Sequence, residues 1–152
     1  FAQPRSEAGA DFDRELLAFV RQLRVPLVLG TYERDDAGEY NVAAYIAPDD
    51  GLLGRYRKTH LFPFTERLPA LLDHAWVRAR LPWTGAWRAG DGARVLPLRL
   101  ADGREVPAGT LICLDDVHPG IAREAARQGA RVLLGMSNDS WFTAWPQGAR
   151  LH

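Results

Sequence analysis

Cysteine is almost absent from the sequence, whose 152 residues contain only Cys113. A single cysteine excludes an internal disulfide and any metal site made of several thiolates. None of the four histidines is spaced to pair with another as metal ligands. We therefore expect neither a bound metal nor another cofactor.

An excess of charge of either sign is also lacking, because 19 lysine and arginine residues balance 19 aspartate and glutamate residues. A balanced surface argues against nucleic acid as a partner. No stretch reaches the roughly 18 consecutive apolar residues that a membrane-spanning helix needs. The 47% of hydrophobic residues does support the core of one globular domain over residues 1–152.

Both ends of the sequence have the character of interrupted segments. Residues 1–4 have the composition of a loop, and residues 146–152 have that of a helix with proline near its start and no terminal cap. We expect a fragment of a longer protein, incomplete at both ends.

The first third of the sequence predicts one helix followed by three strands. Amphipathic spacing predicts the helix over residues 11–24. Two apolar runs around a turn predict a hairpin of strands at residues 25–32 and 40–47. A third strand at residues 52–57 would deliver Lys58 to its end.

Regular periodicity is lost between residues 59 and 92. This stretch holds three prolines and three tryptophans, Trp76, Trp83 and Trp87, with two short pieces compatible with a helix, around residues 68–72 and 75–80. Long irregular loops are usually functional or disordered, and this one is too aromatic for disorder. It fits a lid, a partner surface, a bilayer-interface anchor or a local satellite core.

The last third predicts a second hairpin and then a strand, helix, strand unit. The hairpin covers residues 95–106, the next strand residues 110–112, the helix residues 121–128 and the last strand residues 131–136. A strand, helix, strand connection implies parallel pairing.

Cys113 lies at the exit of the predicted strand at residues 110–112. A side chain there is held at the sheet edge, and the positive end of the following helix would stabilise a thiolate. The alternative is a small buried hydrophobic residue, which is how free cysteine is often used. Residues 137–142 follow the neighbouring parallel strand, so we expect them to form the wall of a pocket beside Cys113.

Together these segments resemble the carbon-nitrogen hydrolase (nitrilase) superfamily, whose catalytic residues are glutamate, lysine and cysteine in that chain order. The motifs are most similar to those of the apolipoprotein N-acyltransferases. Residues 58–66 match Lys-x-His-Leu-x-Pro-Phe-Gly-Glu apart from Thr65, which replaces glycine. Residues 112–115 resemble Ile-Cys-Tyr-Glu, and residues 137–142 match Ser-Asn-Asp-x-Trp-Phe.

The resemblance implies a role for each matched side chain. Cys113 would be the nucleophile that takes an acyl chain as a thioester, Lys58 would stabilise the oxyanion, and Glu66 would support the site. Asp115 stands where the family has a functional glutamate. The remaining supporting or substrate-binding residues would be Asn138, Trp141 and Phe142.

The resemblance also implies an α/β fold, the four-layer αββα sandwich of the nitrilases. The substrates would be a phospholipid acyl donor and an apolipoprotein acceptor. The domain would face the periplasm at the inner membrane of a Gram-negative bacterium, attached through membrane segments that are not in this sequence.

One catalytic motif of the family is not among these residues. The general-base glutamate belongs to a Trp-Pro-Glu motif, and Glu7, the first acidic residue here, has different neighbours. We expect that truncation removed this base and that residues 1–152 alone have little or no turnover.

Two alternatives remain at this point. The first is a soluble amidase or nitrilase of the same superfamily, in which the same residues would serve. The second is a folded scaffold or binding module without activity.

Overall fold

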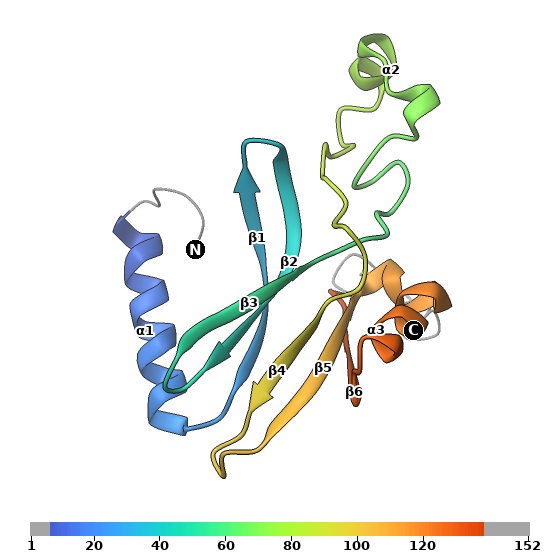
Figure 1. Ribbon diagram of the computed structural model, residues 1–152. Coiled ribbons are helices and arrows are strands. Elements are labelled where there is room, and N and C mark those ends of the chain that lie inside the picture. The colour runs from blue at the N-terminus through green and yellow to red at the C-terminus, as the bar shows by residue number, and fades with distance from the viewer. Residues whose placement is uncertain (1–6, 139–152) are drawn as a thin grey trace, which may run out of the picture.

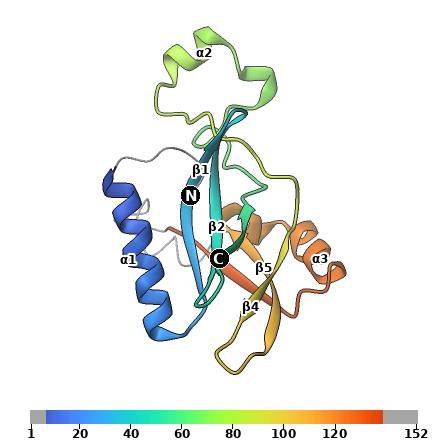
Figure 2. The ribbon, with the colours of Figure 1, turned by 60° about the vertical axis from the view of Figure 1, so that its left-hand side comes forward.

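The computed structural model describes residues 7–138, which form two face-to-face sheets with a helix outside each (Figure 1). The first sheet has the order β1-β2-β3 and the second the order β4-β5-β6. Figure 2 shows α1 and α3 on opposite outer sides, with the sheets between them. The four-layer αββα sandwich expected from the sequence is confirmed. The elements of the layers are α1 (Glu7–Leu23), β1 (Leu27–Asp35), β2 (Gly38–Ala47), β3 (Gly51–Arg57), β4 (Val95–Arg99), β5 (Glu105–Ile112), α3 (Pro119–Arg127) and β6 (Val132–Met136).

The first sheet is an antiparallel meander whose central strand is fully enclosed. Residues 42–47 of β2 are all buried, because β1 and β3 pair with its two edges and its faces meet α1 and the second sheet. The predicted hairpin and third strand are therefore confirmed, with β3 ending one residue before Lys58.

The second sheet combines an antiparallel and a parallel pair. β4 and β5 are antiparallel, whereas β5 and β6 are parallel and are connected through α3, as the strand, helix, strand pattern predicted. The prediction of a break between residues 106 and 110 was wrong, since β5 runs without interruption from Glu105 to Ile112. Pro97 and Pro107 face each other across the ladder, so both missing N–H groups fall at one cross-strand pair.

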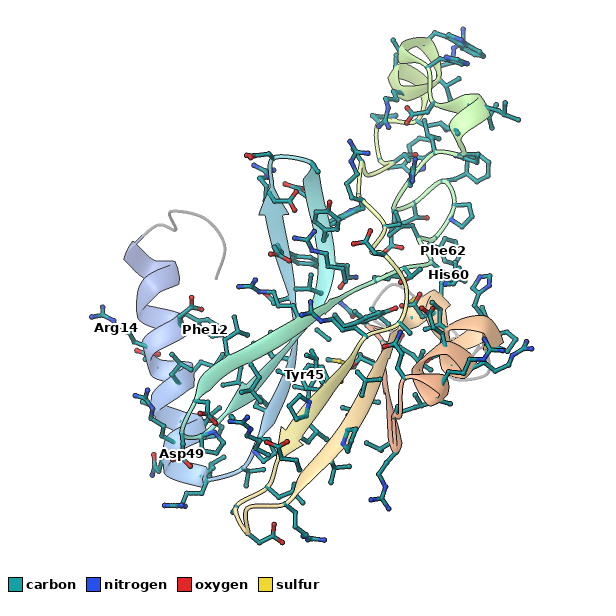
Figure 3. The ribbon with its side chains drawn as sticks, viewed as in Figure 1. Phe12, Arg14, Tyr45, Asp49, His60 and Phe62 are labelled. Atoms are coloured by element: carbon teal, nitrogen blue, oxygen red, sulfur yellow. The ribbon has the colours of Figure 1, made fainter. Side chains whose placement is uncertain are left out.

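The core lies between the two sheets and includes one polar contact. Tyr45 packs against Leu96 and Ala108 of the opposite sheet and lies at the centre of the molecule in Figure 3. Its hydroxyl oxygen lies 2.5 Å from the Oγ1 atom of buried Thr110. Burial raises the pKa of the Tyr45 phenol above its ordinary value, so the hydroxyl keeps its proton and remains a hydrogen-bonding group.

The helices cover the outer faces unequally. α3 packs closely on β5, because a Cβ atom at Gly109 would lie 2.9 Å from the Cβ atom of Ala125. α1 starts four residues earlier than predicted and buries Val20, but Phe12 is 56% exposed and Leu23 is 53% exposed. None of the helices within residues 7–138 is long and apolar enough to cross a membrane.

An arm formed by residues 61–88 extends beyond the sandwich, past the turn between β1 and β2 (Figures 1 and 2). It contains a short 3-10 helix, η1 (Ala70–Leu72), and the helix α2 (Ala75–Arg80), at the two positions predicted to be compatible with helix. Six of its large apolar side chains are exposed: Phe62, Phe64, Leu71, Leu72, Trp76 and Trp83.

Candidate active site

Cys113 follows β5 directly and opens a 3-10 turn, η2 (Cys113–Val117), that the sequence did not predict. Its φ angle is +52°, a left-handed conformation that is uncommon for a residue other than glycine. The side chain is half-buried and packs against the cluster of Ala43, Tyr56 and Ile112 between the sheets. The expected exit from the strand is therefore a sharp backbone bend with the cysteine at its first residue.

Lys58 lies at the end of β3 and is the only lysine in the sequence. Its side chain is 1% exposed, and its Nζ atom lies 2.7 Å from Oε2 of Glu66. The same carboxylate oxygen accepts a hydrogen bond from the Phe62 backbone N–H at 2.7 Å. The structure thus brings two of the three residues assigned to catalysis into direct contact, and Glu66 holds the ammonium group in one position.

Asp115 is completely buried and accepts hydrogen bonds from two separate segments. Its Oδ2 atom accepts from the Tyr56 hydroxyl at 2.8 Å and from the Ile112 backbone N–H at 3.1 Å. Its Oδ1 atom accepts from the His60 backbone N–H at 2.8 Å and lies 3.2 Å from the His60 Nδ1 atom. A buried carboxylate with several donors is satisfied as an anion, and removing it would leave those donors unpaired.

These hydrogen bonds join the lysine segment to the cysteine turn. Tyr56 and His60 lie two residues before and two residues after Lys58, while Asp115 lies two residues after Cys113. The carboxylate of Asp115 therefore ties both sides of Lys58 to the turn that begins with Cys113. The segments that carry Lys58 and Cys113 are thereby joined although they are distant in sequence.

Tyr56 is held in its donor form by its surroundings. Burial, together with the adjacent Asp115 carboxylate, raises the pKa of the Tyr56 phenol far above its ordinary value. The phenol therefore stays protonated at neutral pH and donates to Asp115. The Oγ1 atom of Thr59 lies 3.2 Å from the same phenol oxygen.

The returning part of the arm encloses the lysine segment. The backbone N–H of Gly85 donates to the Thr65 carbonyl at 2.7 Å, and that of Gly90 donates to the Lys58 carbonyl at 2.8 Å. A Cβ atom at Gly90 would lie 2.3 Å from the Arg57 carbonyl oxygen, so only glycine allows this close approach. Figure 3 shows His60 and Phe62 at the root of the arm.

The end of β6 lies beside the cysteine turn. Ile112 and Met136 are register partners at the carboxyl ends of the parallel strands, so Cys113 and the residues after Met136 leave the same sheet edge. Asn138 is exposed at this edge. Trp141 and Phe142, the other residues expected to support the site, lie outside the described residues.

Sequence reasoning missed two contributors to this arrangement. It gave no role to Tyr56, although strand alternation places Tyr56 on the same side of the chain as Lys58. It also missed a parallel stack between the rings of His60 and His118, whose centroids are 3.8 Å apart with an interplanar angle of 10°.

The model of the carbon-nitrogen hydrolase family matches residues 2–150, almost the whole sequence. The chain belongs to the carbon-nitrogen hydrolase family. The expected superfamily membership is therefore confirmed.

Two relatives of this carbon-nitrogen hydrolase domain are named as apolipoprotein N-acyltransferases. An apolipoprotein N-acyltransferase of Bdellovibrio bacteriovorus is 31% identical over 135 residues, covering 84% of this chain and 24% of its own length. Apolipoprotein N-acyltransferase 2 of Treponema denticola is 26% identical over 133 residues, covering 86% of this chain and 25% of its own length. The chain thus spans about a quarter of the length of the curated relatives it matches.

A solved amidase from Nesterenkonia sp. AN1, with acrylamide added to its active-site cysteine, has the same fold with a TM-score of 0.58. It is 19% identical to this carbon-nitrogen hydrolase domain and covers 84% of this chain and 42% of its own.

Proposed function

We propose that this domain carries the reacting groups of an N-acyltransferase, which moves a fatty acyl group from a phospholipid to the N-terminal amine of an apolipoprotein. The observation that carries the proposal is the ion pair of buried Lys58 with part-buried Glu66, in a segment that Asp115 ties to the turn beginning with Cys113. Further support comes from the motifs shared with apolipoprotein N-acyltransferases and from the relatives of that name.

In the first half-reaction the Cys113 thiolate attacks the carbonyl carbon of a phospholipid ester. A C–S bond forms, the ester C–O bond breaks, and the lysophospholipid leaves as an alcohol after taking up a proton. The Lys58 ammonium group donates to the oxygen that becomes negative in the tetrahedral intermediate, while Glu66 holds it in place.

In the second half-reaction the acceptor amine attacks the thioester carbonyl. A C–N bond forms, the C–S bond breaks, and the Cys113 thiolate is regenerated as the amine gives up a proton. The family resemblance assigns the proton transfers to the glutamate of a Trp-Pro-Glu motif that is not among these 152 residues.

The exposed apolar arm supports a lipid donor. Trp76 is 66% exposed, Trp83 67% and Leu71 88%, and arginines such as Arg80 are exposed between them. Tryptophan and arginine suit the boundary between lipid headgroups and acyl chains. We propose that the arm contacts the outer leaflet of a bacterial inner membrane and that the domain faces the periplasm.

The proposal is tested by trapping the acyl-enzyme. The protein as its gene encodes it is incubated with phosphatidylethanolamine vesicles, whose acyl chains are isotopically labelled, and the tryptic peptides are analysed by mass spectrometry. We expect one labelled acyl chain on Cys113, removable by neutral hydroxylamine as a thioester is. A peptide with a diacylglyceryl N-terminal cysteine should then take up the label.

The control and the alternatives use the same preparation. Cys113→Ser should carry no hydroxylamine-sensitive acyl group. Release of ammonia from simple amides, without acylation by phospholipid, would favour the amidase alternative. The absence of both reactions would leave a folded domain without activity.

The membrane contact gives a separate prediction. Replacing Trp76 and Trp83 together with serine should lower the fraction of a protein of residues 1–152 that sediments with phosphatidylethanolamine vesicles by about tenfold, since each exposed indole would bury in the interface. Val25→Ser, which removes an exposed apolar side chain between α1 and β1, is the matched control and should sediment as the unaltered protein does. Equal sedimentation of all three proteins would contradict a role for the arm at the membrane.

A further inference from the structure

His118 stands at the junction of the two segments that follow Cys113. It is the residue that follows η2 and precedes the first residue of α3, so its backbone links the two elements. Although it occupies the N-cap position of α3, its side chain makes no capping hydrogen bond. Its ring instead stacks on the ring of His60.

The stack involves the residue that follows Lys58 by two positions, whereas Tyr56 precedes Lys58 by two. His60 lies two residues after Lys58, and its Nδ1 atom lies 3.2 Å from Asp115. His118 covers the face of the same ring with a centroid distance of 3.8 Å. The His60 ring is thus held at its edge by Asp115 and on its face by His118.

We propose that His118 is a positioning residue, which acts through its stack on His60 to keep Lys58 aligned with the Cys113 turn. Asp115 alone fixes the backbone of residue 60 through one hydrogen bond, whereas the stack adds a contact over a whole ring face. His118 positions His60 through the face of its aromatic ring and not through the basicity of its imidazole. The inference rests on the proposed function, because it concerns the same lysine and thiol.

The test compares two thiol reagents that differ in charge. Iodoacetate is an anion and iodoacetamide is neutral, and both alkylate the Cys113 thiolate. A nearby ammonium group accelerates the anionic reagent more than the neutral one, so the ratio of the two rates reports how close Lys58 lies to the thiol. A loosened fold would raise both absolute rates, whereas loss of alignment lowers the iodoacetate rate relative to the iodoacetamide rate.

We expect His118→Ala to lower the ratio of the iodoacetate rate to the iodoacetamide rate by roughly threefold or more, because a displaced ammonium group attracts the anionic reagent less. His118→Phe should restore the unaltered ratio, because phenylalanine supplies a ring face without an imidazole. Arg127→Ala, at the exposed far end of α3, is the control and should leave the ratio unchanged. Lys58→Met sets the value for a site without the ammonium group.

A second substitution keeps the test decisive if His118→Ala does not fold. His118→Leu fills the volume with an apolar side chain that has no ring, and it should show the lowered ratio while His118→Phe does not. An unchanged ratio in His118→Leu, or a ratio in His118→Phe as low as in His118→Leu, would overturn the proposal. Failure of the phospholipid acylation experiment would instead overturn the proposed function, because alkylation requires no lipid.

Discussion

Lys58→Met is expected to slow the formation of the Cys113 thioester at least about 100-fold, the loss seen when one oxyanion donor is removed from an acyl-transfer site. Methionine keeps the length of the side chain but cannot donate a hydrogen bond. Lys58 is 1% exposed, and its Nζ atom lies 2.7 Å from Oε2 of Glu66. The rate of hydroxylamine-sensitive labelling from phospholipid vesicles measures the effect.

Arginine should not replace this lysine. The Lys58→Arg protein keeps the charge, but the planar guanidinium group is larger than an ammonium group and directs its donors differently. We expect it to lose most of the rate as well. Arg131→Met, which removes an exposed cation at the start of β6, should keep the full rate. A normal rate in Lys58→Met would show that the oxyanion is stabilised by another group.

Asp115→Asn is expected to lower the free energy of unfolding by about 3 kcal/mol, because a buried carboxylate that holds several donors is replaced by a group with one acceptor oxygen. Oδ2 of Asp115 accepts from Tyr56 and Ile112, and Oδ1 accepts from the His60 backbone. In the asparagine variant, an NH₂ group replaces either Oδ1 or Oδ2 and therefore faces a hydrogen-bond donor instead of accepting from it. Urea unfolding followed by fluorescence measures the change.

The same substitution should also disturb the chemistry. Without the carboxylate, the segment on either side of Lys58 is no longer tied to the cysteine turn, so thioester formation should fall even under conditions in which the protein remains folded. Asp36→Asn, in the exposed turn between β1 and β2, is the matched control and should change neither stability nor rate. A loss of stability below about 0.5 kcal/mol in Asp115→Asn, the range of ordinary surface substitutions, would contradict the assigned role.

The order of most helices and strands could be predicted from the sequence. Hydrophobic periodicity located α1, the first three strands and the unit of β5, α3 and β6, because each of these elements buries one face of a regular pattern. It divided β5 into the end of a hairpin at residue 106 and a separate strand at residues 110–112. Only the assembled sheet reveals that Pro107 faces Pro97 and that Gly109 makes room for Ala125.

For the site, motif resemblance selected Lys58, Glu66 and Cys113, and the contact between the first two is present in the structure. Their catalytic roles remain predictions. The stack of His60 on His118 could not have been foreseen, because it depends on how η2 sits against the end of β3 rather than on any local pattern. The burial of Asp115 was hidden for the same reason, since charged residues in a turn are usually exposed.

The root of the arm has a consequence for how such domains diversify. The N–H groups of Gly85 and Trp87 donate to the carbonyls of Thr65 and Glu66, so the two ends of the excursion are fastened to each other before the chain leaves the sandwich. Everything between these fastened ends can lengthen, shorten or change composition at small entropic cost. Insertions and deletions in the arm can therefore change the surface that the domain presents to its partners without moving the ammonium group of Lys58 or the carboxylate of Glu66.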